Sequence, residues 1–187
     1  VIPLSHPQFL KSKSRYAKSY LWKKLTRRAD RVITISEFSK FEIVKYLGFS
    51  ENQIDAIPLG VDQRYFQKIP NSEKQLILDQ LGIKKPFFLF IGSIQPRKNL
   101  TRLLEAHAKL PRSLATQYPL VIAGKVAWDD GKTLSAINLA VSEGRAQWLH
   151  YISERQKLCL LQSAIGLTFV SLYEGFGLPI TEAFASE

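Results

Sequence analysis

The sequence predicts an α/β protein in which helices flank a parallel β-sheet. Two observations predict this class: six short apolar segments have the character of strands, and segments with helical spacing of apolar residues separate them. The alternation favours a parallel sheet because parallel strands need long crossover connections, which are usually helices. The 187 residues, 45% of them apolar, suffice for one substantial core. The predicted strands are residues 31–35, 54–59, 86–92, 119–124, 147–152 and 166–171.

The segments between and after these strands supply the helices. Residues 99–110 and 154–164 carry apolar residues at helical spacing. Pro179 suits the first position of a further helix. The single cysteine, Cys159, lies between two leucines, so we expect it to be buried in the core. One cysteine forms no internal disulfide and fits a reducing compartment.

The segment from Ser171 to Glu182 places two carboxylates eight residues apart around a glycine-rich turn. Gly175 and Gly177 permit a tight turn with exposed backbone N–H groups, and a strand, such a turn and a helix N-terminus together make an anion site. Glu174 would lie in the turn and Glu182 about one turn inside the helix. The alternative is an ordinary strand–turn–helix corner with two solvated glutamates, and the spacing alone leaves both interpretations open.

Four segments resemble the GT4 family, also called group 1, of retaining glycosyltransferases that use nucleotide sugars and have the two-domain GT-B fold. Glu174-Gly-Phe-Gly-Leu-Pro-Ile-Thr-Glu182 resembles the E-x7-E signature of this family. Three further segments resemble it in the family's order, and the Arg-Lys-Asn form of the last is most similar to mannosyltransferase-like members. They are Arg31-Val-Ile-Thr-Ile-Ser-Glu-Phe-Ser-Lys40, Ile57-Pro-Leu-Gly-Val-Asp62 and Phe90-Ile-Gly-Ser-Ile-Gln-Pro-Arg-Lys-Asn-Leu100.

The resemblance implies a division of the chain into parts of two Rossmann-like domains. Residues 1–62 would be the end of an N-terminal acceptor domain, and residues 63–83 a linker with a connecting helix. Residues 84–187 would be a C-terminal domain that binds the nucleotide sugar and is incomplete at its end. We therefore expect part of an enzyme.

Arg97 and Lys98 are the candidate catalytic cations. They follow the apolar run Phe87-Phe-Leu-Phe-Ile-Gly92, which is typical of a buried parallel strand, and ligands of open α/β sheets bind at the carboxyl ends of strands. Negative charge grows on the β-phosphate of a departing nucleotide diphosphate, so catalysis needs cations or amides aimed there. The alternative is two solvated charges, but cations before a helix oppose its dipole unless an anion is present. Many family members carry Arg where this chain has Ser93, and Arg97 would take over that contact.

The resemblance also implies how the remaining site residues act. Glu182 would accept hydrogen bonds from the ribose hydroxyls, and Glu174, the third candidate catalytic residue, would contact the transferred sugar. Backbone amides of the glycine-rich turn would contact the sugar and the phosphate. His150 and Tyr151 would lie where the chain of related enzymes runs next to the nucleotide base. The full set of donor-binding candidates is Gly92, Ser93, His150, Tyr151, Gly175, Phe176, Gly177, Leu178 and Glu182.

We expect no cofactor and no metal beyond the nucleotide-diphosphate sugar itself, which is a co-substrate. Phosphate recognition by cations and amides needs no Mg²⁺, and the three histidines have no metal-ligand spacing. Paired carboxylates also occur in glycosidases. That interpretation does not explain the cations Arg97 and Lys98 or the glycine-rich turn.

The net charge of +10 is concentrated near the start of the chain. Residues 1–31 hold nine Lys or Arg and one acidic residue, and residues 14–29 have the pattern of an amphipathic basic helix. Three interpretations compete: a solvated helix face, a contact with an anionic membrane, and a nucleic-acid patch. No nucleic-acid motif supports the last. No apolar run is long enough for a transmembrane helix. We expect a cytoplasmic protein, and the second interpretation adds peripheral contact with the inner membrane face.

Two functions remain open on these grounds. The first is a glycosyltransferase that moves a hexose, with mannose as the candidate, to a saccharide or lipid-linked acceptor in polysaccharide biosynthesis. The second is a non-catalytic module or fragment that binds a nucleotide sugar.

Overall fold

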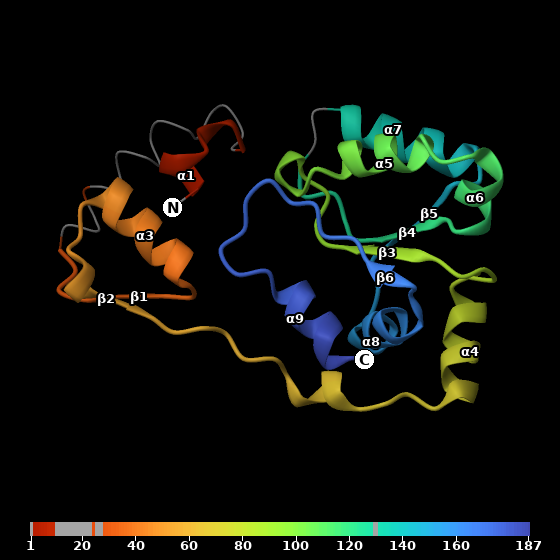
Figure 1. The fold of residues 1–187 in the computed structure, drawn as a ribbon, viewed down its shortest axis with the longest axis horizontal. Helices are drawn as coiled ribbons and strands as arrows, with labels where there is room; N and C mark the ends of the chain where they lie inside the picture. Colours follow the sequence, from red (N-terminus) through yellow and green to blue (C-terminus); the bar gives the residue numbers. More distant parts are fainter. Residues whose placement is uncertain (1, 10–23, 25–27, 129–130) are drawn as a thin grey trace. The chain divides into compact units, whose positions relative to one another are not determined.

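The computed structural model divides into two compact units (Figure 1). It describes residues 2–9, 24, 28–128 and 131–187. The first unit comprises Val1–Gly60 with Glu174–Gly177, and the second comprises Val61–Tyr173 with Leu178–Glu187. The predicted basic helix over residues 14–29 lies almost entirely outside the described residues.

The first unit contains a two-stranded parallel sheet. Its strands β1 (Val32–Thr34) and β2 (Ile54–Ala56) pair directly and confirm the first two predicted strands, although both are shorter than predicted. Helix α3 (Glu37–Leu47) connects them; Ser36 caps its start and Gly48, at φ 77°, ends it. The short helices α1 (Ile2–Ser5) and η1 (Pro7–Phe9) precede this pair, and η3 (Glu51–Gln53) leads into β2.

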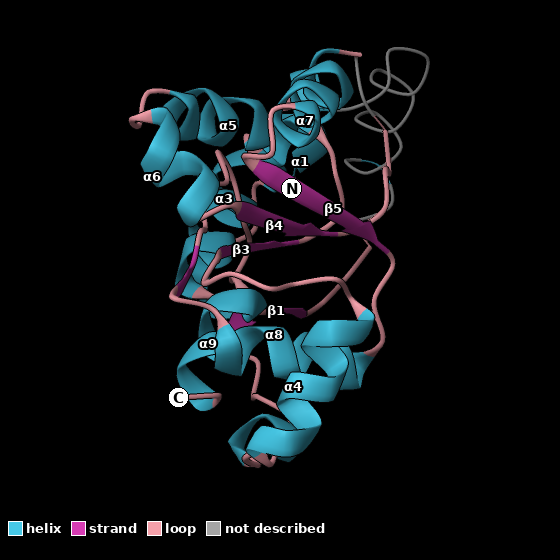
Figure 2. Ribbon diagram, turned by 90° about the vertical axis from the view of Figure 1, so that its right-hand side faces the viewer, coloured by secondary structure: helices cyan, strands magenta, loops and turns pink. Residues whose placement is uncertain are grey.

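The second unit is built on a four-stranded parallel sheet in the order β5-β4-β3-β6. Figure 2 shows β5, β4 and β3 side by side. The strands confirm the four remaining predictions and the predicted α/β class. Their bounds are β3 (Phe88–Ile91), β4 (Leu120–Ala123), β5 (Ala146–His150) and β6 (Gly166–Leu167).

Strand β6 is much shorter than the predicted segment 166–171. The N–H and the hydroxyl of Thr168 both donate to the carbonyl oxygen of Leu89 in β3, at 2.7 and 2.9 Å. The chain beyond Thr168 leaves the sheet edge and turns toward the loop that follows β3, as the hydrogen bonds of Val170 and Leu172 show.

Helices cover both faces of this sheet (Figures 1 and 2). One face carries α5 (Leu100–Ala108) and α7 (Lys132–Ser142), with α6 (Arg112–Gln117) beside α5. The other face carries α8 (Glu154–Ser163), against which α4 (Asn71–Gln80) and α9 (Leu178–Ala185) pack. The short helix η4 (Gln63–Phe66) contacts α9.

Alternating strand residues build a separate core on each face. Phe90 and Ile122 join the buried cluster under α5 and α7, whereas Leu89 and Val121 join the cluster under α8. All four are at most 2% exposed. Successive strand residues point to opposite faces, so the apolar run predicted as a buried strand can fill both cores.

Helix α8 confirms the prediction for Cys159, which is fully buried there. Burial raises the pKa of its thiol above the ordinary value. Pro179 is the second residue of α9 and not the first, because α9 begins at Leu178. Among the described residues, no helix combines the length and the apolar composition that a membrane crossing requires.

Candidate functional site

The loops at the carboxyl ends of β3, β4 and β5 surround a hollow of about 250 Å³ in the second unit. Gly92 and Ser93 follow β3, Lys125 lies after β4, and His150 ends β5. The start of α8 closes the hollow with Glu154 and Lys157. This is the sheet edge where open α/β sheets bind ligands.

Two glycines allow the loops after β3 and β4 to meet. Gly124 has φ 157°, and a Cβ atom there would lie 1.9 Å from the carbonyl oxygen of Gly92. No other residue type fits this approach without moving one of the loops. Gly92 has φ 152°, and a Cβ atom on it would lie 3.5 Å from Cε of Lys98. Gly92 and Gly124 therefore line the hollow, and the stem of Lys98 packs against Gly92.

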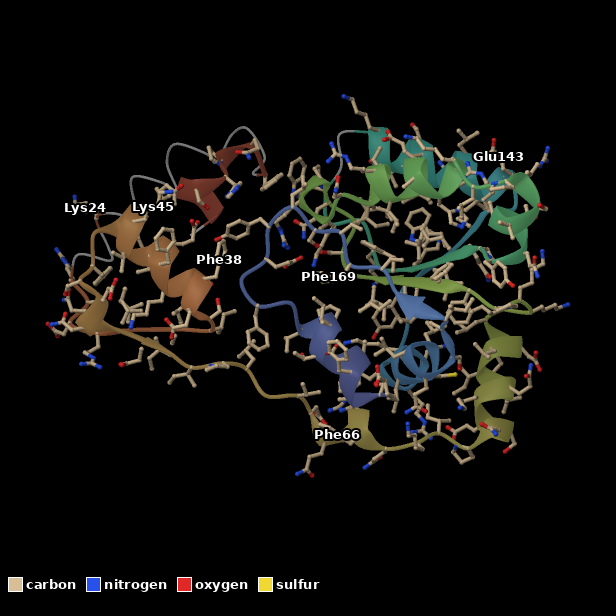
Figure 3. The ribbon with its side chains drawn as sticks, viewed as in Figure 1. Lys24, Phe38, Lys45, Phe66, Glu143 and Phe169 are labelled. Atoms are coloured by element: carbon tan, nitrogen blue, oxygen red, sulfur yellow. The ribbon has the colours of Figure 1, made fainter. Side chains whose placement is uncertain are left out.

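Lys98 ends the short helix η5 (Pro96–Lys98) that follows β3 and precedes α5. It is only 9% exposed, and its Nζ lies 5.7 Å from the ring centroid of Phe169, labelled in Figure 3. Lysine is rarely buried, because its charge loses hydration. Asn99 follows in the left-handed region at φ 59° and donates to the carbonyl oxygen of Val170 at 3.1 Å.

Arg97 joins the same loop to the segment after β6. Its Nη1 donates to the carbonyl oxygen of Tyr173 at 2.6 Å, and the N–H of Leu172 donates to the carbonyl oxygen of Arg97 at 2.9 Å. Ser93 is exposed, and its hydroxyl accepts a hydrogen bond from Gln95 at 2.9 Å. The two predicted cations thus share one loop but differ in their surroundings.

His150 is the last residue of β5, which ends two residues before the predicted strand 147–152 does. The strand is irregular here: Ile122 pairs with Trp148 and Ala123 with His150, which leaves Leu149 as an extra residue. His150 has φ 55°, and its ring centroid lies 3.7 Å from that of Trp148. Trp148 in turn donates to the carbonyl oxygen of Gly124 at 2.9 Å.

Tyr151 forms the exposed rim of the hollow. Its side chain is 71% exposed, and Nζ of Lys125 lies 4.6 Å from its ring centroid. A flat ring with a cation over one face offers a stacking surface to a planar heterocycle.

Glu182 lies about one turn inside α9, as predicted, and is 9% exposed. Its Oε1 accepts from Nζ of Lys157 at 2.7 Å. Its Oε2 is buried and has no hydrogen-bond partner within the described part of the chain. Tyr65 of η4 lies nearby and donates to Oε2 of Glu154 at 3.0 Å.

The segment Glu174–Gly177 belongs to the first unit. There the carbonyl oxygen of Gly175 accepts from the hydroxyls of Ser36 at 2.5 Å and Ser39 at 3.3 Å. Gly177 has φ 96°, which fits the predicted tight turn, and Leu178 begins α9 in the second unit. The two glutamates of the signature therefore belong to different compact units.

Sequence reasoning missed several residues that line the hollow. Gly124 ends the predicted strand 119–124 and Lys125 directly follows it, so the rule that ligands bind at carboxyl ends of strands would have selected them. Glu154 and Lys157 carry no such signal, because helix-surface charges are common. Among residues 2–9, 24, 28–128 and 131–187, no cluster of three His, Cys, Asp or Glu side chains is placed to hold a metal ion.

Comparison with known proteins identifies the family. The family model described as "Glycosyl transferases group 1" matches residues 73–187, and "Glycosyltransferase Family 4" matches residues 2–65. O-antigen chain mannosyltransferase B of Escherichia coli is 30% identical over 98% of this chain and 47% of its own length. Serotype-specific mannosyltransferase WbdA of Escherichia coli is 28% identical over 83% of this chain and 20% of its own length.

The crystal structure of Anabaena Alr3699/HepE in complex with UDP-glucose has a TM-score of 0.77 at 19% identity, over 98% of this chain and 49% of that chain. Such structural relatives are GT-B glycosyltransferases, which confirms the predicted fold class. The chain spans less than half the length of the two curated relatives. The group 1 model nevertheless covers more than half of this chain, and the chain belongs to the group 1 glycosyl transferases.

Proposed function

We propose that the chain carries the donor-binding part of a retaining glycosyltransferase of the GT4 type, which transfers a hexose from a nucleotide-diphosphate sugar to a saccharide or lipid-linked acceptor. Mannose is the first candidate because two relatives are mannosyltransferases. Glucose on a uridine nucleotide is the second, because a structural relative was solved with UDP-glucose. Residues 84–187 would form the donor domain, and residues 1–62 would belong to the acceptor domain.

One observation carries this proposal: a buried lysine packs against a glycine that lines a hollow at the carboxyl edge of a parallel sheet. Lys98 is 9% exposed, and its stem lies against Gly92. A cation in a site of low dielectric stabilises negative charge far more than the same cation in water. The diphosphate of the donor supplies that charge, and it grows when the bond to the sugar breaks.

The proposed reaction exchanges one bond at the anomeric carbon of the sugar. The bond from this carbon to the β-phosphate oxygen breaks, and the nucleoside diphosphate leaves with the electron pair. A bond from an acceptor hydroxyl oxygen to the same carbon forms, and the hydroxyl proton passes to a phosphate oxygen of the leaving group. Attack from the face on which the leaving group departs retains the configuration.

The remaining side chains have roles in binding. Glu182 would accept hydrogen bonds from the ribose hydroxyls, and Glu174 would contact the transferred sugar. His150 and Tyr151 would form the wall against the nucleotide base. The amides of Phe176, Gly177 and Leu178, together with the cations Arg97 and Lys98, would hold the phosphates without a metal ion.

A donor screen tests this proposal. Binding of the protein to GDP-mannose, UDP-glucose and ADP-glucose is measured by calorimetry, and sugar transfer to a saccharide acceptor is followed with and without excess EDTA. We expect one donor to bind with clear preference, Lys98→Ala to weaken it, and EDTA to leave transfer unchanged. No binding of any donor would reject the proposal, and a strict need for added Mg²⁺ or Mn²⁺ would reject its metal-free form. Donor binding without transfer would favour the non-catalytic module.

A further inference from the structure

Four polar side chains gather next to the hollow in the second unit. Tyr65 comes from η4, Glu154 and Lys157 come from the first turn of α8, and Glu182 comes from α9. Side chains of two other elements, η4 and α8, therefore converge on the carboxylate of Glu182.

The two carboxylate oxygens of Glu182 have different surroundings among the described residues. Its Oε1 receives Nζ of Lys157 at 2.7 Å, and the two side chains are 12% and 17% exposed. Its Oε2 is buried and lacks a hydrogen-bond partner among the described residues. An ionised carboxylate oxygen that is buried without a donor is costly, so the arrangement calls for a donor that can reach it.

The hydroxyl of Tyr65 is the available donor. Tyr65 is 3% exposed, and its ring packs in the cluster that includes Ile77 and Leu158. Its hydroxyl donates to Oε2 of Glu154 at 3.0 Å, and its one proton can serve one carboxylate at a time. Burial first, then the hydrogen bond to Glu154 and the nearby carboxylate of Glu182, raise the pKa of Tyr65. The hydroxyl therefore keeps its proton throughout the working pH range.

Lys157 is itself fixed from two directions. Besides its contact with Glu182, its Nζ lies 5.2 Å from the ring centroid of Tyr65. A cation over an aromatic face is attracted to it, and an ammonium group has three N–H donors to distribute. Tyr65 therefore contributes twice, through its ring to Lys157 and through its hydroxyl to Glu154.

We infer that Tyr65 and Lys157 are positioning residues that fix the carboxylate of Glu182 for the ribose hydroxyls of the donor. Lys157 holds Oε1, and the Tyr65 hydroxyl turns from Glu154 to serve the buried Oε2. A carboxylate held at both oxygens keeps one orientation toward the ligand, so less rotamer freedom is lost on binding. This inference rests on the proposed function, which makes Glu182 a ribose contact.

The test compares nucleotides that differ only in the ribose. Dissociation constants for GDP and UDP, and for their 2′-deoxy and 3′-deoxy forms, are measured with the parent protein, Tyr65→Phe, Lys157→Met and Glu182→Gln. The parent is expected to prefer the ribose form by about 10-fold or more, and Glu182→Gln to remove most of this preference. Tyr65→Phe and Lys157→Met are each expected to lower the preference by about 3-fold or more. Lys157→Arg is expected to restore part of it.

A matched control separates positioning from general stability. Arg155→Gln removes a charge from the same helix, where Arg155 pairs with Glu73 at 2.6 Å, and is expected to leave the ribose preference unchanged. A purely structural role would lower the melting temperature and weaken ribose and deoxyribose forms equally. An unchanged preference in Tyr65→Phe and Lys157→Met, with a loss in Glu182→Gln, would overturn the inference and leave the proposed function intact. No ribose preference in the parent would overturn both.

Discussion

Arg97 and Tyr173 are joined by a 2.6 Å hydrogen bond from the guanidinium Nη1 to the backbone carbonyl oxygen. The carbonyl oxygen of Arg97 accepts in return from the N–H of Leu172 at 2.9 Å. This reciprocal pair fixes the end of the segment that follows β6, directly before Glu174. Arg97 therefore has a structural contact besides the diphosphate role proposed for it.

Replacement of the two cations should separate these roles. Lys98→Ala is expected to cost about 3 kcal/mol of transition-state stabilisation, which lowers turnover about 10²-fold with little change in melting temperature. Arg97→Ala is expected to lower both turnover and melting temperature, because it also removes the bond to Tyr173. Steady-state kinetics and thermal melting measure the two effects. Arg102→Ala, on the exposed side of α5, is the control. An unchanged turnover in Lys98→Ala would show that Lys98 does not stabilise the transition state.

The two glutamates of the signature are expected to differ in the step they affect. Glu182→Ala should act mainly on donor binding, because a hydrogen bond to a charged group is worth about 1.5–3 kcal/mol. Glu174→Ala should depress turnover more than binding, because its proposed contact is with the transferred sugar. Donor dissociation constants and turnover of both variants are compared after their folding is checked by circular dichroism. Parent-like values in both variants would favour the interpretation as an ordinary strand–turn–helix corner.

Much of the fold follows from local pattern, whereas the site depends on contacts that are distant in sequence. The run from Phe88 to Ile91 is apolar on both faces, so its burial in a parallel sheet could be predicted. The pairing of Lys157 with Glu182 could not, because it joins two helices whose packing no local pattern specifies. The need for Gly124 was missed for the same reason: the atom that excludes a side chain there belongs to Gly92, in another loop.

The basic segment 14–29 predicts a reversible, salt-sensitive contact with anionic lipid. Each Lys or Arg near an anionic surface contributes about 1 kcal/mol, and salt screens the attraction. The protein is expected to sediment with anionic vesicles at low salt and to be released at high salt, whereas neutral vesicles should not retain it. A variant with Lys23, Lys24, Arg27 and Arg28 changed to Gln should bind less. Equal binding to both vesicle types would favour the interpretation of this segment as a solvated helix face.

Cys159 should resist thiol reagents in the folded protein. It is fully buried, and burial raises the pKa of its thiol, so both access and the thiolate fraction are low near neutral pH. The reactive thiolate becomes more abundant only as the pH rises toward that raised pKa. Titration with a chromogenic disulfide is expected to detect one thiol in denaturant and very little without it. Rapid reaction of the folded protein would show that α8 opens readily.

His150 allows backbone strain and ligand contact to be measured separately. Its φ of 55° lies in the left-handed region, which costs a residue with a side chain about 1–2 kcal/mol, less for His and Asn than for most. His150→Gly removes this cost but adds freedom to the unfolded chain, so the free energy of unfolding should change by less than about 1 kcal/mol. His150→Val should lower it by about 1–3 kcal/mol, because a β-branched side chain fits that region poorly.

Nucleotide binding by the same variants then tests the proposed base wall. If the imidazole, which lies tilted against the Trp148 ring, contacts the base, His150→Gly should weaken binding of the preferred nucleoside diphosphate although the protein is as stable as the parent. His150→Asn keeps a residue that tolerates the left-handed region and removes the ring, so it should match the glycine variant in affinity. Denaturant unfolding and calorimetry supply the two quantities. Parent-like affinity in both variants would limit His150 to a structural role at the end of β5.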